Sequence, residues 1–185
     1  KIYQYNMKGY LMKMTVDLNG VLGDVVSNIL PKLNKEYKTN YAKIDINEWN
    51  FPIGGVSIGT HLKRYFADPV FLLTVPVIEG AKEAIKKIMK DHEVVIVTGR
   101  PNYTKRYTYM WLVDNFLFNG VIFTPNKTVQ STGCDVLVDD SHGYLNKFRF
   151  SGGKTIQFVQ PWNLSHLTDN CAHFWSEIPD MINDI

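Results

Sequence analysis

Short apolar runs alternate along the chain with segments whose apolar residues recur at helical spacing. Residues 13–18 predict a first strand, and the apolar residues at 22, 25, 26, 29 and 33 then follow the spacing of one helix face. Pro31 is expected to bend or shorten this helix. Alternation of this kind favours an α/β fold, with a parallel sheet flanked by helices.

The same alternation returns in the second half of the chain. Residues 81–89 carry an apolar stripe that predicts a helix, and residues 94–97 predict a short buried strand. A further helix around Trp111 is expected to end before Gly120. The remaining predicted elements are strands at 121–123, 136–138 and 155–159 and a closing helix within 175–185.

From about residue 37 to residue 76 the alternation is interrupted. Aromatic residues crowd this stretch, among them Trp49, Phe51, Tyr65 and Phe71. It is too long for a plain connection within a compact domain. We therefore expect a small, mostly helical cap inserted after the first strand–helix unit. The predicted division is a core of residues 12–36 and 77–185, a cap of residues 37–76, and a tail or tag remnant at residues 1–11.

Composition narrows the classes of ligand. The chain of 185 residues has 20 Lys and Arg against 18 Asp and Glu, a balance that gives no reason to expect a nucleic-acid polymer or a membrane surface. No apolar run approaches the roughly 20 residues of a membrane helix. Cys134 and Cys171 lack the spacing of zinc ligands. We expect a cytoplasmic protein with a local site for a small ligand; a homodimer stays open.

Polar groups follow three of the predicted strands. Asp17 ends the first strand, Thr98 and Gly99 end the second, and Asp139 and Asp140 end a later one. In open parallel sheets ligands bind beyond the carboxyl ends of the strands, so these residues are expected to meet at one edge.

Three carboxylates packed together would repel one another unless a cation joined them. Mg²⁺ prefers oxygen ligands and is often shared with a substrate phosphate. The Thr98 hydroxyl, the backbone at Gly99 and the positive charge of Lys127 could hold that phosphate. Singly, each feature has an ordinary explanation, because aspartates cap turns and helices and lysines are mostly solvated. Their order and spacing together favour a phosphoryl-transfer site.

These segments resemble the four motifs of the haloacid dehalogenase (HAD) superfamily. They are residues 16–22 (VDLNGVL), residues 95–100 (VIVTGR), Lys127 and residues 137–140 (LVDD), in the order of that superfamily. Within it, the chain is most similar to the 5′(3′)-deoxyribonucleotidases, through residues 68–81 and the run from Asn126 to Asp140. The resemblance implies a Rossmann-like core with a cap, and a Mg²⁺-dependent phosphatase acting on nucleoside monophosphates.

The resemblance also implies roles for single residues. Asp17 would attack phosphorus and carry a transient aspartyl phosphate. Mg²⁺ would be bound by Asp17, Asp139, Asp140 and the backbone carbonyl of Asn19, and the phosphate by Thr98, Gly99 and Lys127. The cap aromatics Trp49, Phe51, Tyr65 and Phe71 would stack on a base, or, as is more frequent for such residues, form the core of the cap.

The chain departs from the superfamily at Asn19. The superfamily has an aspartate there, which acts as general acid and base, whereas a carboxamide cannot exchange a proton near neutral pH. Since such groups contribute about 10²–10⁴-fold, we predict slow or negligible turnover. Asn19 could be engineered, could be natural with another proton donor, or could mark a protein that binds a nucleotide or phosphate without hydrolysing it. The sequence leaves these alternatives open.

Overall fold

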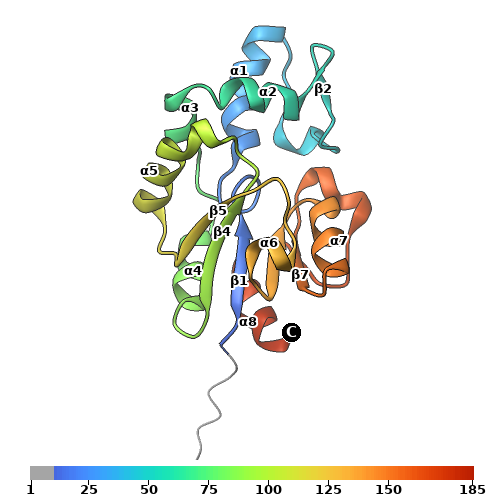
Figure 1. The fold of residues 1–185 in the computed structure, drawn as a ribbon. Coiled ribbons are helices and arrows are strands. Elements are labelled where there is room, and N and C mark those ends of the chain that lie inside the picture. The colour runs from blue at the N-terminus through green and yellow to red at the C-terminus, as the bar shows by residue number, and fades with distance from the viewer. Residues whose placement is uncertain (1–10) are drawn as a thin grey trace, which may run out of the picture.

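The protein is built around a parallel sheet of six strands. The computed structural model describes residues 11–185, so residues 1–10 of the predicted tail lie outside the described part. The strands lie in the order β5–β4–β1–β6–β7–β8, and Figure 1 shows β5, β4 and β1 side by side. Their bounds are β1 Lys13–Asp17, β4 Glu93–Thr98, β5 Gly120–Phe123, β6 Val136–Asp139, β7 Lys154–Phe158 and β8 Cys171–Ala172. The predicted α/β class is confirmed.

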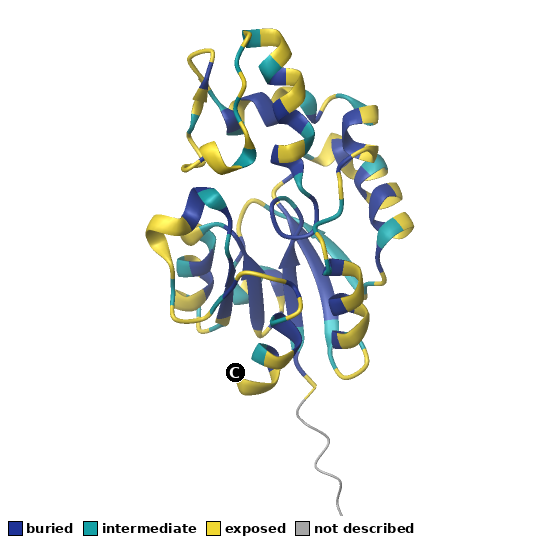
Figure 2. Cartoon of the chain, turned by 180° about the vertical axis from the view of Figure 1, so that it is seen from behind, coloured by how far each residue is buried: buried dark blue, intermediate teal, exposed yellow. Residues whose placement is uncertain are grey.

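The middle strands are apolar because both faces of the sheet are covered. Residues Met14 to Asp17 of β1 are all buried, as is all of β6, and Figure 2 shows the middle of the sheet in dark blue. Strand β1 pairs in parallel with β4 on one side and β6 on the other, with Asp17 opposite Val97 and Val16 opposite Val138. This register brings the last residues of three strands to the same edge.

Helices flank the sheet (Figure 1). Their bounds are α1 Val25–Tyr37, α2 Ile58–Tyr65, α3 Pro69–Leu73, α4 Ala81–Ile88, α5 Lys105–Asn115, α6 Val129–Thr132, α7 His142–Phe150 and α8 Ile178–Asp184. The pattern did not predict α6 and α7. None of the helices among residues 11–185 is long and apolar enough to span a membrane.

Helix α1 lies beside the predicted insert, above the carboxyl edge of the sheet. The insert holds the 3₁₀ helix η1 (Lys43–Asp45), the hairpin of β2 (Pro52–Ile53) and β3 (Val56–Ser57), and α2, and Figure 1 shows α1 beside them. Helix α1 contacts both η1 and α2. It also continues through Pro31 to Tyr37, so Pro31 does not end it. We call residues 38–76 the cap; the boundary between cap and core stays a prediction.

Candidate active site

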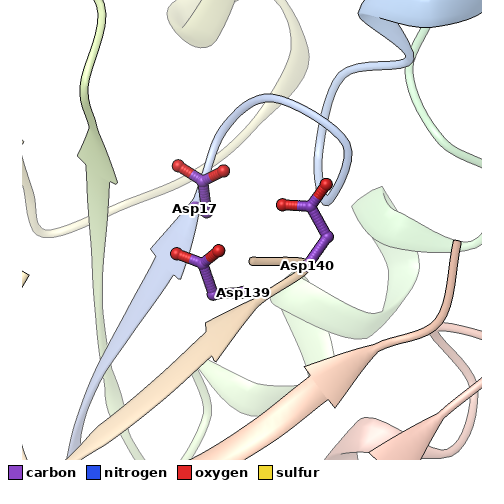
Figure 3. A group of neighbouring side chains, drawn as sticks. All are labelled: Asp17, Asp139 and Asp140. Atoms are coloured by element: carbon purple, nitrogen blue, oxygen red, sulfur yellow. The ribbon is translucent and has the colours of Figure 1, made fainter. Parts of the chain in front are cut away.

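The ends of β1 and β6 bring three carboxylates together. Asp17 is the last residue of β1, Asp139 is the last of β6, and Asp140 follows it (Figure 3). One carboxylate oxygen from each lies within 4.8 Å of the others, and all three residues are buried. The convergence expected from the strand order is therefore present.

Lys127 lies between two of these carboxylates. Its Nζ is 2.7 Å from Asp17 Oδ1 and 2.7 Å from Asp139 Oδ2, and the residue is only 2% exposed. Burial by itself would lower the pKa of Lys127, but the negative charges of Asp139 and Asp17 outweigh it and raise that pKa. The same Nζ lies 4.3 Å from the centre of the Tyr144 ring, a cation–π distance. Lys127 is thus a fixed positive charge.

One ammonium group does not balance three acids. Burial, together with the charge of Asp17, raises the pKa of Asp139 to about 6 although Lys127 acts in the opposite direction. Burial and the charges of Asp139 and Asp17 raise the pKa of Asp140 well above its usual range. Burial is the largest cause of both pKa shifts, and the mutual repulsion of the acids adds to it. A divalent cation with oxygen ligands fits this donor set.

The two neighbouring acids differ in their contacts. Both oxygens of Asp139 are engaged, Oδ2 with Lys127 and Oδ1 with the backbone N–H of Ser141 at 2.7 Å. Asp140 accepts one hydrogen bond at Oδ2, 2.7 Å from Trp162 Nε1, and among residues 11–185 no donor reaches its Oδ1. Asp140 therefore has more freedom than Asp139 to bind a cation.

The loop after β1 fits closely against Asp140. Gly20 has φ +83°, and a Cβ there would lie 2.4 Å from Asp140 Oδ2, so only glycine is accommodated. The Gly20 carbonyl accepts a hydrogen bond from Gln160 Nε2 at 2.7 Å, and the Val21 carbonyl accepts one from Trp175 Nε1 at 2.8 Å. Residues from the C-terminal third thus hold the loop that carries Asn19.

Asn19 contacts a buried arginine that the sequence analysis did not single out. Arg100 Nε donates to Asn19 Oδ1 at 2.9 Å, and Arg100 Nη1 donates to Thr108 Oγ1 at 3.2 Å. The guanidinium is 2% exposed, its Nη2 has no partner among the described residues, and burial lowers the pKa of Arg100. Its only sequence signal is its place directly after Thr98-Gly99. The buried Thr98 Oγ1 accepts from the backbone N–H of Arg100 at 3.2 Å.

A cavity of about 660 Å³ opens from the cluster toward the cap. The predicted site residues that line the cavity are Asp17, Asn19, Gly99, Lys127, Asp139, Asp140 and the cap residue Trp49. The cap residue Phe66 also lines it, whereas the predicted aromatics Phe51, Tyr65 and Phe71 do not. Phe71 is fully buried and packs on Tyr65 at 5.4 Å between ring centroids, and Phe51 packs on Tyr41 at 5.1 Å. They form apolar packing, so base stacking by the predicted aromatics is retained for Trp49 alone.

Comparisons with known proteins identify the family and the fold. The family model described as "5′ nucleotidase, deoxy (Pyrimidine), cytosolic type C protein" matches residues 11–185. No match was found among curated proteins.

Solved structures share the fold at low sequence identity. A haloacid dehalogenase-like family hydrolase from Streptococcus pneumoniae has a TM-score of 0.67 at 14% identity, over 93% of this chain and 98% of that one. A HAD-superfamily hydrolase of subfamily IA from Geobacter sulfurreducens has a TM-score of 0.60 at 15% identity, over 93% and 96%. A 2-haloacid dehalogenase from Pseudomonas syringae has a TM-score of 0.57 at 14% identity, over 94% and 99%.

Proposed function

Because the chain belongs to the family of deoxy (pyrimidine) 5′ nucleotidases of cytosolic type C, we propose that it is a phosphomonoesterase acting on nucleoside monophosphates. The observation that carries the proposal is the cluster of Asp17, Asp139 and Asp140 with Lys127 at the floor of a cavity large enough for a nucleotide. The expected compartment is the cytoplasm, and a homodimer remains open.

In this proposal Asp17 is the nucleophile. One of its oxygens forms a bond to phosphorus while the bond from phosphorus to the ester oxygen breaks, leaving an aspartyl phosphate. Lys127 and the backbone at Gly99 stabilise charge on the phosphate oxygens. A water oxygen then bonds to phosphorus while the bond from phosphorus to the Asp17 oxygen breaks, so inorganic phosphate leaves and Asp17 is regenerated.

Mg²⁺ is the cofactor that the donor set favours. Asp17, Asp140 and the backbone carbonyl of Asn19 would hold it, while Asp139 would mainly fix Lys127. When bound, the ion would neutralise the acids and polarise the phosphate. Thr98, through its bond to the Arg100 backbone, would shape the turn that presents Gly99.

Asn19 limits the expected rate. The leaving oxygen needs a proton and the attacking water must lose one, and a carboxamide supplies neither transfer. A second candidate function is therefore non-catalytic binding of a nucleotide or phosphate. The Asn19–Arg100 hydrogen bond favours it, because it occupies Asn19 Oδ1 and leaves the Nδ2 group as a donor for a phosphate oxygen in the cavity.

One experiment separates the two functions. Phosphate release is measured with Mg²⁺ on a panel of nucleoside and deoxynucleoside monophosphates, for this chain and for Asn19→Asp. A gain of about 10²-fold or more in the variant supports a phosphatase limited at one position, and the panel identifies its substrate. If neither protein releases phosphate from any compound, the hydrolase proposal fails and binding becomes the better account.

A further inference from the structure

The 3₁₀ helix η3 (Pro161–His166) follows β7 and lies against the acidic cluster. Trp162, on this helix, is 7% exposed, and its Nε1 donates to Asp140 Oδ2 at 2.7 Å. Its neighbour Asn163 donates through Nδ2 to the Asp140 backbone carbonyl at 2.9 Å. Both the side chain and the backbone of Asp140 are thus fixed by one short segment.

The same indole ring also contacts the cap. The ring centroids of Trp162 and Trp49 lie 5.6 Å apart, and Lys43 Nζ lies 5.7 Å from the Trp162 ring. Lys43 is ion-paired with Asp24, which caps the first turn of α1, at 2.8 Å. Trp162 is therefore in contact with a carboxylate of the cluster on its N–H edge and with two cap residues through its ring.

We propose that Trp162 is a positioning residue that holds Asp140 in its cation-binding orientation, and that Trp49 makes this hold depend on the position of the cap. The inference rests on the proposed function, because it takes the acidic cluster to bind a divalent cation. It adds a physical link between that cation and the part of the substrate that reaches the cap.

The link follows from the contacts. A hydrogen bond to a carboxylate ligand fixes which oxygen faces the ion, and such supporting bonds typically change metal affinity by about 10- to 100-fold. When Trp49 and Lys43 cover the ring, the indole is held in place. Withdrawal of the cap removes those contacts and leaves the indole free to turn away from Asp140. A ligand that keeps the cap in contact should then tighten cation binding, and by linkage the cation should tighten that ligand equally.

The first part of the experiment tests the hydrogen bond. Mg²⁺ affinity is measured by titration calorimetry on the full chain, for wild type, Trp162→Phe and Leu164→Ala. Trp162→Phe keeps a ring but removes the N–H donor, and we expect about 10- to 100-fold weaker Mg²⁺ binding. Leu164 lies on the same helix and is 50% exposed, so its variant should bind Mg²⁺ like wild type.

The second part tests the cap contact. Mg²⁺ affinity is remeasured with inorganic phosphate, which occupies only the cluster, and with a non-hydrolysable phosphonate analogue of thymidine monophosphate, which extends toward the cap. Phosphate tightens Mg²⁺ directly, so the informative quantity is the additional tightening by the analogue. Trp49→Leu should abolish this additional tightening while leaving the effect of phosphate unchanged. Because Trp49 already contacts the Trp162 ring without a ligand, the variant should also bind Mg²⁺ more weakly than wild type in the free protein.

The outcomes are distinct. If wild type binds no Mg²⁺, the metal-dependent function and this inference both fail. If wild type binds Mg²⁺ and Trp162→Phe binds it equally well, only the positioning role is refuted. If Trp49→Leu keeps the full additional tightening, the link to the cap is refuted. Should Trp162→Phe not fold, Trp49→Leu still tests the hold on Asp140: Trp49 is 39% exposed, and an Mg²⁺ affinity of the free variant equal to that of wild type would refute it.

Discussion

Removal of the Lys127 ammonium tests the electrostatic account of the site most directly. Lys127→Met keeps the length of the side chain but leaves Asp17 and Asp139 facing each other, each having lost a partner at 2.7 Å. Breaking a buried ion pair by removing one partner costs about 3–5 kcal/mol, because the remaining charge stays buried. For a chain of this size each kcal/mol shifts Tm by about 2–4 °C, so we expect a loss of roughly 6–20 °C.

The assay is thermal unfolding followed by circular dichroism in the presence of a chelator, at pH 7.5 and at pH 5. The deficit should shrink at pH 5, since the pKa of Asp139 is already raised to about 6 with Lys127 present and rises further without it. Lys147→Met is the matched control, because Lys147 is exposed on α7 and its Nζ also lies near the Tyr144 ring, at 5.9 Å.

Two results would refute this reasoning. One is a Tm for Lys127→Met within about 2 °C of wild type at pH 7.5, which would mean that the ion pairs add little stability. The other concerns Asp139→Asn, which should lower the free energy of unfolding less in the Lys127→Met background than in wild type. An equal loss in both backgrounds would show that Lys127 and Asp139 do not interact.

Three further predictions concern the acidic cluster. Gly20→Ala should weaken Mg²⁺ binding and lower Tm, because its Cβ would meet Asp140 Oδ2 at 2.4 Å; calorimetry and thermal unfolding measure both, and unchanged values would contradict the close fit. Asp17→Asn should abolish any phosphoenzyme detected by mass spectrometry after exposure to an aryl phosphate, and a phosphorylated variant would exclude Asp17 as nucleophile. The folded-state pKa of Asp139, about 6, lies above the value of about 3.9 for an unfolded aspartate, so the native state binds more protons between these values. In chelator, the free energy of unfolding should therefore rise as the pH is lowered from 7 to 5, and saturating Mg²⁺ should suppress the rise; urea titrations without this trend would refute it.

The sequence predicted those features of the site that depend on strand order. Once β1, β4 and β6 are recognised as parallel neighbours, Asp17, Thr98 and Asp139 must meet, because all three end strands at one edge. Lys127 lies on no predicted element, and the sequence predicted only that its positive charge could hold the phosphate, not which acids it pairs with. The structure places it between them.

Residues that act through long-range contacts were not predictable in this way. Trp162 lies in a 3₁₀ helix without periodic pattern, and it meets Asp140 across 22 positions of the chain. Phe71, in contrast, was predicted as a site residue but lies in the core of the cap. An aromatic residue in a cap suggests base stacking, but Phe71 is 0% exposed, and burial depends on packing partners that composition does not reveal.

Arg100 changes the interpretation of Asn19. Because the guanidinium donates to Asn19 Oδ1, the Asn19 Nδ2 group is the one left for the cavity that Asn19 lines. An N–H donor can hold a phosphate oxygen, but it cannot accept a proton from water. The two halves of the proposed reaction are therefore affected unequally. Attack by Asp17 can proceed when the leaving oxygen needs little protonation, whereas breakdown of the aspartyl phosphate lacks its base. With a good leaving group we accordingly expect one rapid turnover per site followed by slow release, and this separates an impaired hydrolase from a pure binding protein.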